Sequence, residues 1–110
     1  MHVIEESNGL THVALEGDLD IEGTNAVQDP FYFHLTSRRK PAIVDLSGVK
    51  FIASLGIGML VRVSQSLRRH GVGMVLLSPA RMVDETLRAA HIDQVIPIAA
   101  TREEALERVA

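Results

Sequence analysis

Ser54 is the hydroxyl residue whose place in the sequence points most directly to chemistry. It stands immediately before a long stretch with helical periodicity, where the N-cap of a helix is expected. A helix N-terminus presents free backbone N–H groups and the positive end of the helix dipole, so it can bind an anion or carry a phosphate. The sequence therefore allows two roles for Ser54, a structural N-cap and a site of phosphorylation.

Other residues with catalytic potential do not form a recognisable active site. The glycine pairs Gly56-x-Gly58 and Gly71-x-Gly73 do not extend to a dinucleotide fingerprint, and the lysine of a phosphate-binding P-loop is missing. No Ser-His-Asp or paired-carboxylate arrangement can be proposed from spacing. The histidines show no metal-ligand spacing and are expected at the surface or at helix ends: His2, His12, His34, His70 and His91. We therefore expect a protein that is not an enzyme and that holds no cofactor or metal.

The composition is that of one globular domain, which we place at residues 1–110. Apolar residues make up 46% of the 110-residue chain and charged residues 23%. The net charge of −3, with dispersed lysines and arginines, disfavours nucleic acid as a partner. No apolar run reaches the length of about 18 residues that a membrane span needs, so we expect no direct membrane insertion. Because there is no cysteine and no recognisable signal peptide, the cytoplasm is the expected compartment.

Hydrophobic periodicity and turn residues predict alternating strands and helices. The expected elements are strands at 2–6 and 11–16, a helix at 29–38, a buried strand that includes 42–44, a helix at roughly 55–70, a strand at 73–77, a helix at 80–90, a strand at 94–98 and a last helix from 101. The first helix is expected to begin with Asp29 as N-cap and Pro30 in its first turn. Asp45 and Gly48 are turn residues, which predicts a tight loop before the long helix. This order predicts an α/β fold: a mixed β-sheet of about four to five strands, with about four helices packed mainly on one side.

The stretch from Asp45 to Ile57 resembles the signature of the STAS domain, whose usual form is D-L-S-x-V-x-F-[IML]-D-S-[ST]-G-[LI]. The matching residues are Asp45-Leu46-Ser47, Val49, Phe51-Ile52, Ser54 and Gly56-Ile57. Two positions depart from the signature, because Ala53 replaces the aspartate and Leu55 replaces the residue that the family phosphorylates. The resemblance implies a single STAS-like domain along almost the whole chain, in which residues 25–28 are already helical.

STAS domains occur in bacterial anti-sigma-factor antagonists, in stressosome proteins and in the cytoplasmic tails of sulfate-type anion transporters, so the resemblance implies a protein partner. In the antagonists, the unphosphorylated protein binds an ATP-dependent kinase that also sequesters a sigma factor, and phosphorylation releases it. The expected partner is therefore an anti-sigma factor of the serine kinase type. With Leu55 at the acceptor position, we expect the usual switch to be lost or moved, with Ser54 as the candidate site.

Two segments are expected to form the partner surface. The resemblance implies that Gly17–Asp20 lies beside the signature, whereas the simplest alternative is a turn whose aspartates cap the next segment. On a helical wheel, Leu55 and Met59 lie on the polar side of the long helix and are expected to be exposed there, unless Leu55 packs under a neighbouring loop. Exposed apolar groups beside polar ones suit a protein contact. The predicted partner-binding residues are Asp18, Asp20, Ser54, Leu55, Gly56, Met59 and Arg62.

The same features leave three alternatives open. The missing phosphoacceptor would suit a non-switching STAS subunit of a larger assembly, such as a stressosome-like particle or a membrane transport system. The N-terminus of the long helix could instead hold a nucleotide or another small ligand. Exposed Leu55 and Met59 would also suit a homodimer.

Overall fold

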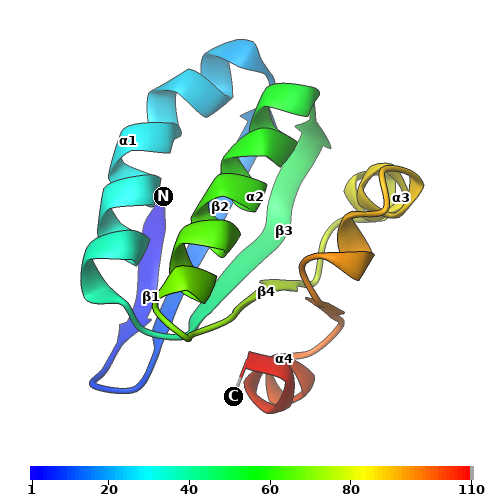
Figure 1. Ribbon diagram of the computed structural model, residues 1–110. Coiled ribbons are helices and arrows are strands. Elements are labelled where there is room, and N and C mark those ends of the chain that lie inside the picture. Colours follow the sequence, from blue (N-terminus) through cyan, green and yellow to red (C-terminus); the bar gives the residue numbers. More distant parts are fainter. Residues whose placement is uncertain (110) are drawn as a thin grey trace.

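A five-stranded sheet forms the centre of the computed structural model, which describes residues 1–109 (Figure 1). The strands lie in the sheet in chain order; β1 is antiparallel to β2, and the other neighbours are parallel. The elements are β1 (His2–Glu6), β2 (Thr11–Leu19), α1 (Ile21–Arg38), β3 (Ala42–Ile52), α2 (Ser54–Arg69), β4 (Met74–Leu77), α3 (Arg81–Ala89), a 3-10 helix (Ile92–Gln94), β5 (Ile98–Ala99) and α4 (Arg102–Val109). The predicted mixed sheet is confirmed.

The helices cover the two faces of the sheet unequally. Figure 1 shows α1 and α2 side by side in front of the sheet. Phe31 of α1, Leu60 of α2 and Leu87 of α3 belong to the larger core on this face. On the opposite face, Ala105 and Val109 of α4 belong to a smaller core. The helices therefore pack mainly on one side, as predicted, and α4 is the exception within residues 1–109.

β2 and β3 continue beyond the rest of the sheet as a two-stranded ribbon. Pairing of β3 with β4 ends at Asp45 and Leu77, whereas its pairing with β2 continues to Leu19 and Ile52. The ribbon therefore projects by roughly 20 Å, at about 3.3 Å for each strand residue. The prediction of a tight loop around Gly48 is wrong, because this part of β3 continues as a strand and pairs with β2. Two register shifts interrupt the regular pairing of the ribbon.

α1 begins at Ile21, well before the predicted start at Pro30. Its N-cap is Asp20, whose Oδ1 accepts a hydrogen bond from the backbone N–H of Gly23 at 2.7 Å. Pro30 lies inside the helix, where its missing N–H removes one backbone hydrogen bond, and Asp29 is exposed. Asp29 is therefore not the N-cap that the sequence predicts. The helical conformation implied for residues 25–28 is confirmed.

α2 is buried on two sides rather than one. Leu60, Val63 and Leu67 enter the larger core. Met59, predicted to be exposed, has only 1% of its surface accessible, and Ser66 is also buried. The prediction for Met59 is wrong because α1 packs along α2, which a wheel drawn for one helix cannot show.

Candidate functional site

The free end of the β2–β3 ribbon, which we call the ribbon tip, comprises residues 17–21 and 51–56. In the strand register, Asp18 lies beside Phe51 and Leu19 lies beside Ile52. The backbone N–H of Ala53 donates a hydrogen bond to the Leu19 carbonyl oxygen at 2.9 Å, which closes the tip. The structure thus brings together the two segments that the sequence predicts to form one surface.

Two glycines allow the helices to approach the ribbon tip closely. A Cβ on Gly23 of α1 would lie 1.9 Å from the Asp18 carbonyl oxygen. A Cβ on Gly56 of α2 would lie 3.0 Å from the Leu19 Cβ and 3.1 Å from the Ile52 Cγ1. Both helices can therefore begin directly at the tip. Gly56 is itself buried, so it positions the first turn of α2 rather than presenting a side chain at the surface.

Ser54 is the first residue of α2, and the N-cap position belongs to Ala53. The predicted N-cap role of Ser54 is wrong, since no side chain of the described residues caps this helix. The cause is the backbone of Ala53: it is extended (φ −99°, ψ 173°), and its carbonyl oxygen already accepts the first helical hydrogen bond, from the N–H of Ile57 at 3.0 Å. Ser54 is exposed. Its hydroxyl is therefore accessible at the positive end of the helix dipole.

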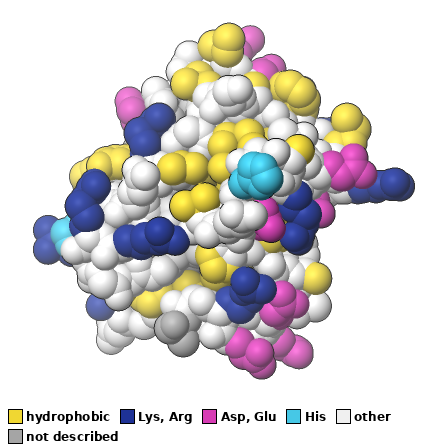
Figure 2. Space-filling model, turned by 45° about the vertical axis from the view of Figure 1, so that its right-hand side comes forward, with side chains coloured by type: hydrophobic (Ala, Val, Ile, Leu, Met, Phe, Trp, Pro, Cys, Tyr) yellow, Lys and Arg dark blue, Asp and Glu magenta, His cyan; other side chains and the backbone are white. Residues whose placement is uncertain are grey.

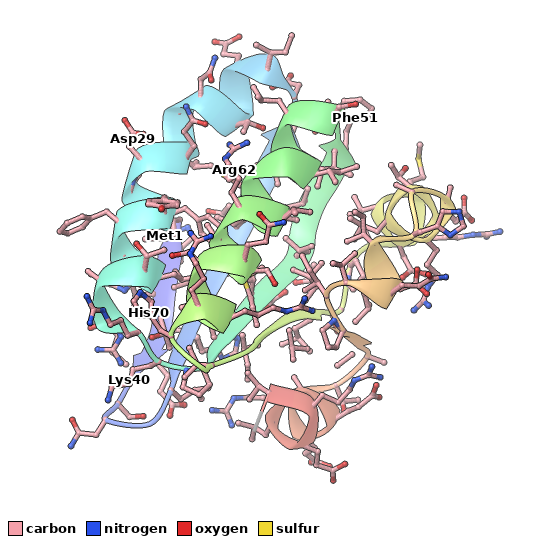
Figure 3. The ribbon with its side chains drawn as sticks, in the orientation of Figure 1. Met1, Asp29, Lys40, Phe51, Arg62 and His70 are labelled. Atoms are coloured by element: carbon pink, nitrogen blue, oxygen red, sulfur yellow. The ribbon has the colours of Figure 1, made fainter. Side chains whose placement is uncertain are left out.

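Large apolar side chains are exposed at the ribbon tip. Ile21 is 69% exposed and Phe51 is 49% exposed, while Leu55 is half-buried. Figure 3 shows Phe51 at the outer end of β3, and Figure 2 shows hydrophobic side chains at the surface at the top of the molecule, where α1 and α2 begin. Sequence reasoning missed Ile21 and Phe51 as site residues. Strand alternation next to buried Ile52 could have identified Phe51.

Acidic residues border this apolar surface. Asp18 is exposed beside Phe51. Asp20 is half-buried, and one of its carboxylate oxygens is engaged in capping α1. The alternative role predicted for the Gly17–Asp20 segment, capping of the next element, is thus correct for Asp20. Asp18 remains available for contact with another molecule.

Met59 and Arg62 lie apart from the ribbon tip. Together with Gln28, Asp29 and Tyr32 they line a hollow of about 220 Å³ between α1 and α2. Figure 3 shows Arg62 in the space between the two helices, with Asp29 on α1. Arg62 is eight residues beyond Ser54, which is about 12 Å along a helix. The predicted site residues are therefore divided, with five at the ribbon tip and two in this hollow.

His12 is the one histidine of the described residues that is buried; its exposed fraction is 4%. The expectation that it lies at the surface is wrong, because β1 and β3 flank it on β2 and Arg102 of α4 covers it. Burial lowers the pKa of His12, and the charge of Arg102 lowers it further, against the opposite influence of Asp45 and Glu5. His12 therefore favours its neutral form more than an exposed histidine does.

Residues 1–109 contain no cluster of three or more His, Cys, Asp or Glu side chains that could hold a metal ion. Nor does any helix in this range combine the length and the apolar character needed to cross a bilayer. The ribbon tip itself combines exposed apolar side chains with one exposed hydroxyl, that of Ser54.

Comparison with known proteins identifies the family. The STAS domain model matches residues 2–105. The chain is 31% identical over 71 residues to the anti-sigma-F factor antagonist RsfA of Mycobacterium tuberculosis. This match covers 64% of the chain and 56% of RsfA, so it spans little more than half the length of that relative.

Solved structures agree with this assignment. A crystal structure of an anti-sigma factor antagonist from Thermotoga maritima has a TM-score of 0.80 at 26% identity, covering 91% of this chain and 86% of the other. An anti-sigma factor antagonist from Mycobacterium paratuberculosis has a TM-score of 0.85 at 21% identity, covering 99% and 92%, and so shares the fold. The chain belongs to the STAS domain family, among relatives named anti-sigma factor antagonists.

Proposed function

We propose that this domain is a non-enzymatic regulator of the anti-sigma factor antagonist type, which binds reversibly to an anti-sigma factor of the serine kinase type through the ribbon tip. The observation that carries the proposal is the exposure of Ile21 and Phe51 next to exposed Ser54. The name of the relative RsfA supports this class of partner.

The chemistry of the ribbon tip indicates what the partner must present. Ile21, Phe51 and half-buried Leu55 would fill an apolar depression, since apolar side chains gain most when a contact removes them from water. Asp18 lies at the border of this surface and would pair with a basic side chain at the rim. The partner surface is therefore expected to be an apolar depression bordered by Lys or Arg.

Ser54 takes over the role of the missing phosphoacceptor in this proposal. A phosphate on its hydroxyl would add about −1.5 to −2 charges at the first residue of α2, where the helix N-terminus favours an anion. The same charge would lie close to Leu55 and Phe51, and its desolvation would oppose an apolar contact. Phosphorylation would thus weaken partner binding while leaving the domain folded.

Affinity capture from the native host tests the contact surface. Wild type should recover a histidine-kinase-like ATPase or an anti-sigma factor, and binding of that purified partner to Phe51→Asp and Leu55→Asp should be at least about tenfold weaker, or about 1.4 kcal/mol. The matched control is Phe33→Asp, because Phe33 is 73% exposed on α1 and lies outside the ribbon tip. Equal affinity of all four proteins would contradict the proposed surface.

Intact-mass analysis with the purified partner and ATP tests the switch. Wild type should gain the mass of one phosphate, Ser54→Ala should gain none, and Ser54→Asp should bind the partner at least about tenfold more weakly than Ser54→Ala. A phosphate that still forms on Ser54→Ala would show that another hydroxyl carries the switch.

A second candidate function is supported by Leu55, which occupies the acceptor position and cannot be phosphorylated. The domain would then be a permanent subunit of a larger assembly, such as a stressosome-like particle or a membrane transport system. Size-exclusion chromatography of the captured complex separates the two functions. A stoichiometric complex that is unchanged by ATP favours the subunit role, whereas release by ATP favours the switch.

A further inference from the structure

The loops that follow β4 and β5 lead to opposite faces of the sheet. β4 and β5 are parallel neighbours, with Leu77 beside Ala99. After β4 the chain enters α3, whose Leu87 packs in the larger core; after β5 it enters α4, whose Val109 packs in the smaller core. In open parallel sheets, ligands bind outside the carboxyl ends of the strands at such a point of divergence, because the departing loops leave a crevice there.

A crevice of about 420 Å³ lies at this point. Its volume falls within the range of about 300–1,000 Å³ that is usual for small-molecule sites. Figure 1 shows α3 and α4 as separate helices beyond β4. The residues that line the crevice come from both loops, both helices and β5: Ser78, Pro79, Asp84, Arg88, Ile98, Ala99, Ala100 and Glu104.

Hydrogen bonds between the two loops hold the crevice in shape. The N–H of Ser78 donates to the Ala99 carbonyl oxygen at 2.8 Å, and its hydroxyl donates to the Ala100 carbonyl oxygen at 2.6 Å. Ser78 has a positive φ of 49°, an uncommon conformation for a residue other than glycine. The loop after β4 is therefore tied to the loop after β5, so the site is preformed rather than created by a ligand.

The charges around the crevice favour a cation. Arg88 donates from Nε to both carboxylate oxygens of Asp84, at 3.0 and 3.1 Å, and lies 3.8 Å from the Asp93 carboxylate, so its charge is already balanced. Glu104 lies on the α4 side, and its ion pair with Arg108 is 3.7 Å long, which exceeds a good hydrogen bond. Counting Asp84, Asp93 and Glu104 against Arg88 and Arg108 leaves one net negative charge around the crevice.

We propose that this crevice between α3 and α4 is a binding site for a small aliphatic amine. The protonated amino group would donate hydrogen bonds to the Glu104 carboxylate, which is less engaged than the Asp84 carboxylate. The carbon chain would lie against Pro79 and Ile98. The site is distinct from the ribbon tip, because the tip lies roughly 20 Å further along the sheet.

Titration of the ¹⁵N-labelled domain with 1,4-diaminobutane tests the proposal by NMR. Saturable shifts are expected at the backbone amides of Ser78, Ala100 and their neighbours. Glu104→Gln should weaken binding about tenfold, since a charged acceptor becomes neutral without a change in side-chain size. The matched control Glu107→Gln, an exposed residue of the same helix that does not line the crevice, should bind as wild type does.

The proposal would be overturned by the absence of saturable shifts in the crevice or by equal affinity of wild type and Glu104→Gln. Equal binding of butane-1,4-diol, which matches the diamine in length without charge, would also overturn it. Shifts scattered over acidic side chains elsewhere would have the same meaning, because they would report unspecific ion pairing. The variant Phe51→Asp distinguishes this proposal from the proposed function at the ribbon tip. It should lose the protein partner and keep diamine binding.

Discussion

The carboxyl edge of the parallel part of the sheet, β2 to β5, is built in two different ways in this protein. At β2 and β3, the following helices α1 and α2 lie on the same face and pack against each other. At β4 and β5, the following helices α3 and α4 lie on opposite faces and leave a crevice of about 420 Å³. The direction taken by successive helices thus decides whether this edge is closed or open.

The two regions also differ in their side chains. The closed region exposes the apolar Ile21 and Phe51 at its surface, as a protein contact requires. The open region is lined by charged side chains and by apolar residues such as Pro79 and Ile98, a mixture that suits a small polar ligand. Two glycines, Gly23 and Gly56, make the closed arrangement possible by allowing the helices to reach the ribbon tip. Substitutions can therefore affect one region and spare the other.

The largest effect is expected from Met59→Ala, which removes a buried side chain from the contact between α1 and α2. The free energy of unfolding should fall by about 2–5 kcal/mol, as for other large-to-small changes in a core. Urea denaturation measures it, with Met82→Ala as control, because Met82 is 67% exposed and should change stability by less than about 0.5 kcal/mol. A loss as small as that of the control would mean that α1 does not cover Met59.

The next effect concerns Gly23→Ala, which tests the close approach of α1 to the ribbon tip. Because alanine is the better helix former, the substitution alone should raise the free energy of unfolding by up to about 1 kcal/mol. The new Cβ would, however, lie 1.9 Å from the Asp18 carbonyl oxygen, so the clash should dominate. We expect a net loss of about 1–3 kcal/mol in urea denaturation. NMR shift changes should be confined to the closed region and leave the residues of the crevice unaffected.

Gly58→Ala is the matched control for this substitution, since Gly58 is also helical and an added Cβ would meet only the flexible end of Arg62, at 3.3 Å. The arginine can move, so the gain in helix propensity should dominate and raise stability by up to about 1 kcal/mol. If both alanine variants were stabilised, the packing at Gly23 would be looser than the structure indicates.

The smallest effect is a pH dependence carried by His12, on the side of the sheet where Arg102 begins α4. Burial and Arg102 lower the pKa of His12 in the folded state, so the unfolded chain binds more protons. The contribution of His12 to stability is therefore fully present above the ordinary histidine pKa of about 6.5. It is lost as the pH falls from there toward the lower pKa of the folded state.

The slope from this one group cannot exceed about 1.4 kcal/mol per pH unit. Urea denaturation between about pH 7.5 and 5 measures it, with His12→Gln as the comparison. In His12→Gln, the free energy of unfolding should change less with pH than in the wild type. If both proteins showed the same slope, other groups would carry the pH dependence. Because Arg102 of α4 contacts His12, amide exchange in acid should increase near α4 before it increases at the ribbon tip.

Much of the fold was predictable because it depends on local patterns. The residue pattern of 11–16 predicted a strand there, and its residues Val13 and Leu15 lie in the larger core. The helical pattern of residues 55–70 predicted the long helix that the structure places at Ser54–Arg69. The start of α1 was not predictable in this way. Asp20 and the Asp29-Pro30 pair are both good helix starts, and the earlier one prevails because Gly23 packs against the Asp18 carbonyl.

The candidate site was predictable in part. The segments around Asp18 and Ser54 do meet, because parallel strands bring their carboxyl ends to one edge of the sheet. The N-cap assignment of Ser54 failed by one residue, since the carbonyl oxygen of extended Ala53 already accepts the first helical hydrogen bond, from Ile57. The prediction that Met59 is exposed was wrong because α1, a different helix, packs against α2 there.

The residue pattern was enough to predict the order of the helices and strands, the signature that identifies the family, and the loss of a hydroxyl at Leu55. It was wrong for the last strand, predicted at 94–98, since β5 is Ile98–Ala99 and a 3-10 helix covers Ile92–Gln94. The correct predictions depend on residue types and on periodicity along a single segment. Three features emerge only in the folded molecule: Met59 is covered, Phe51 is exposed beside Asp18, and α4 lies on the other face of the sheet. The physical reason is that burial and crevices arise between elements distant in the chain, and local periodicity carries no information on which of them become neighbours.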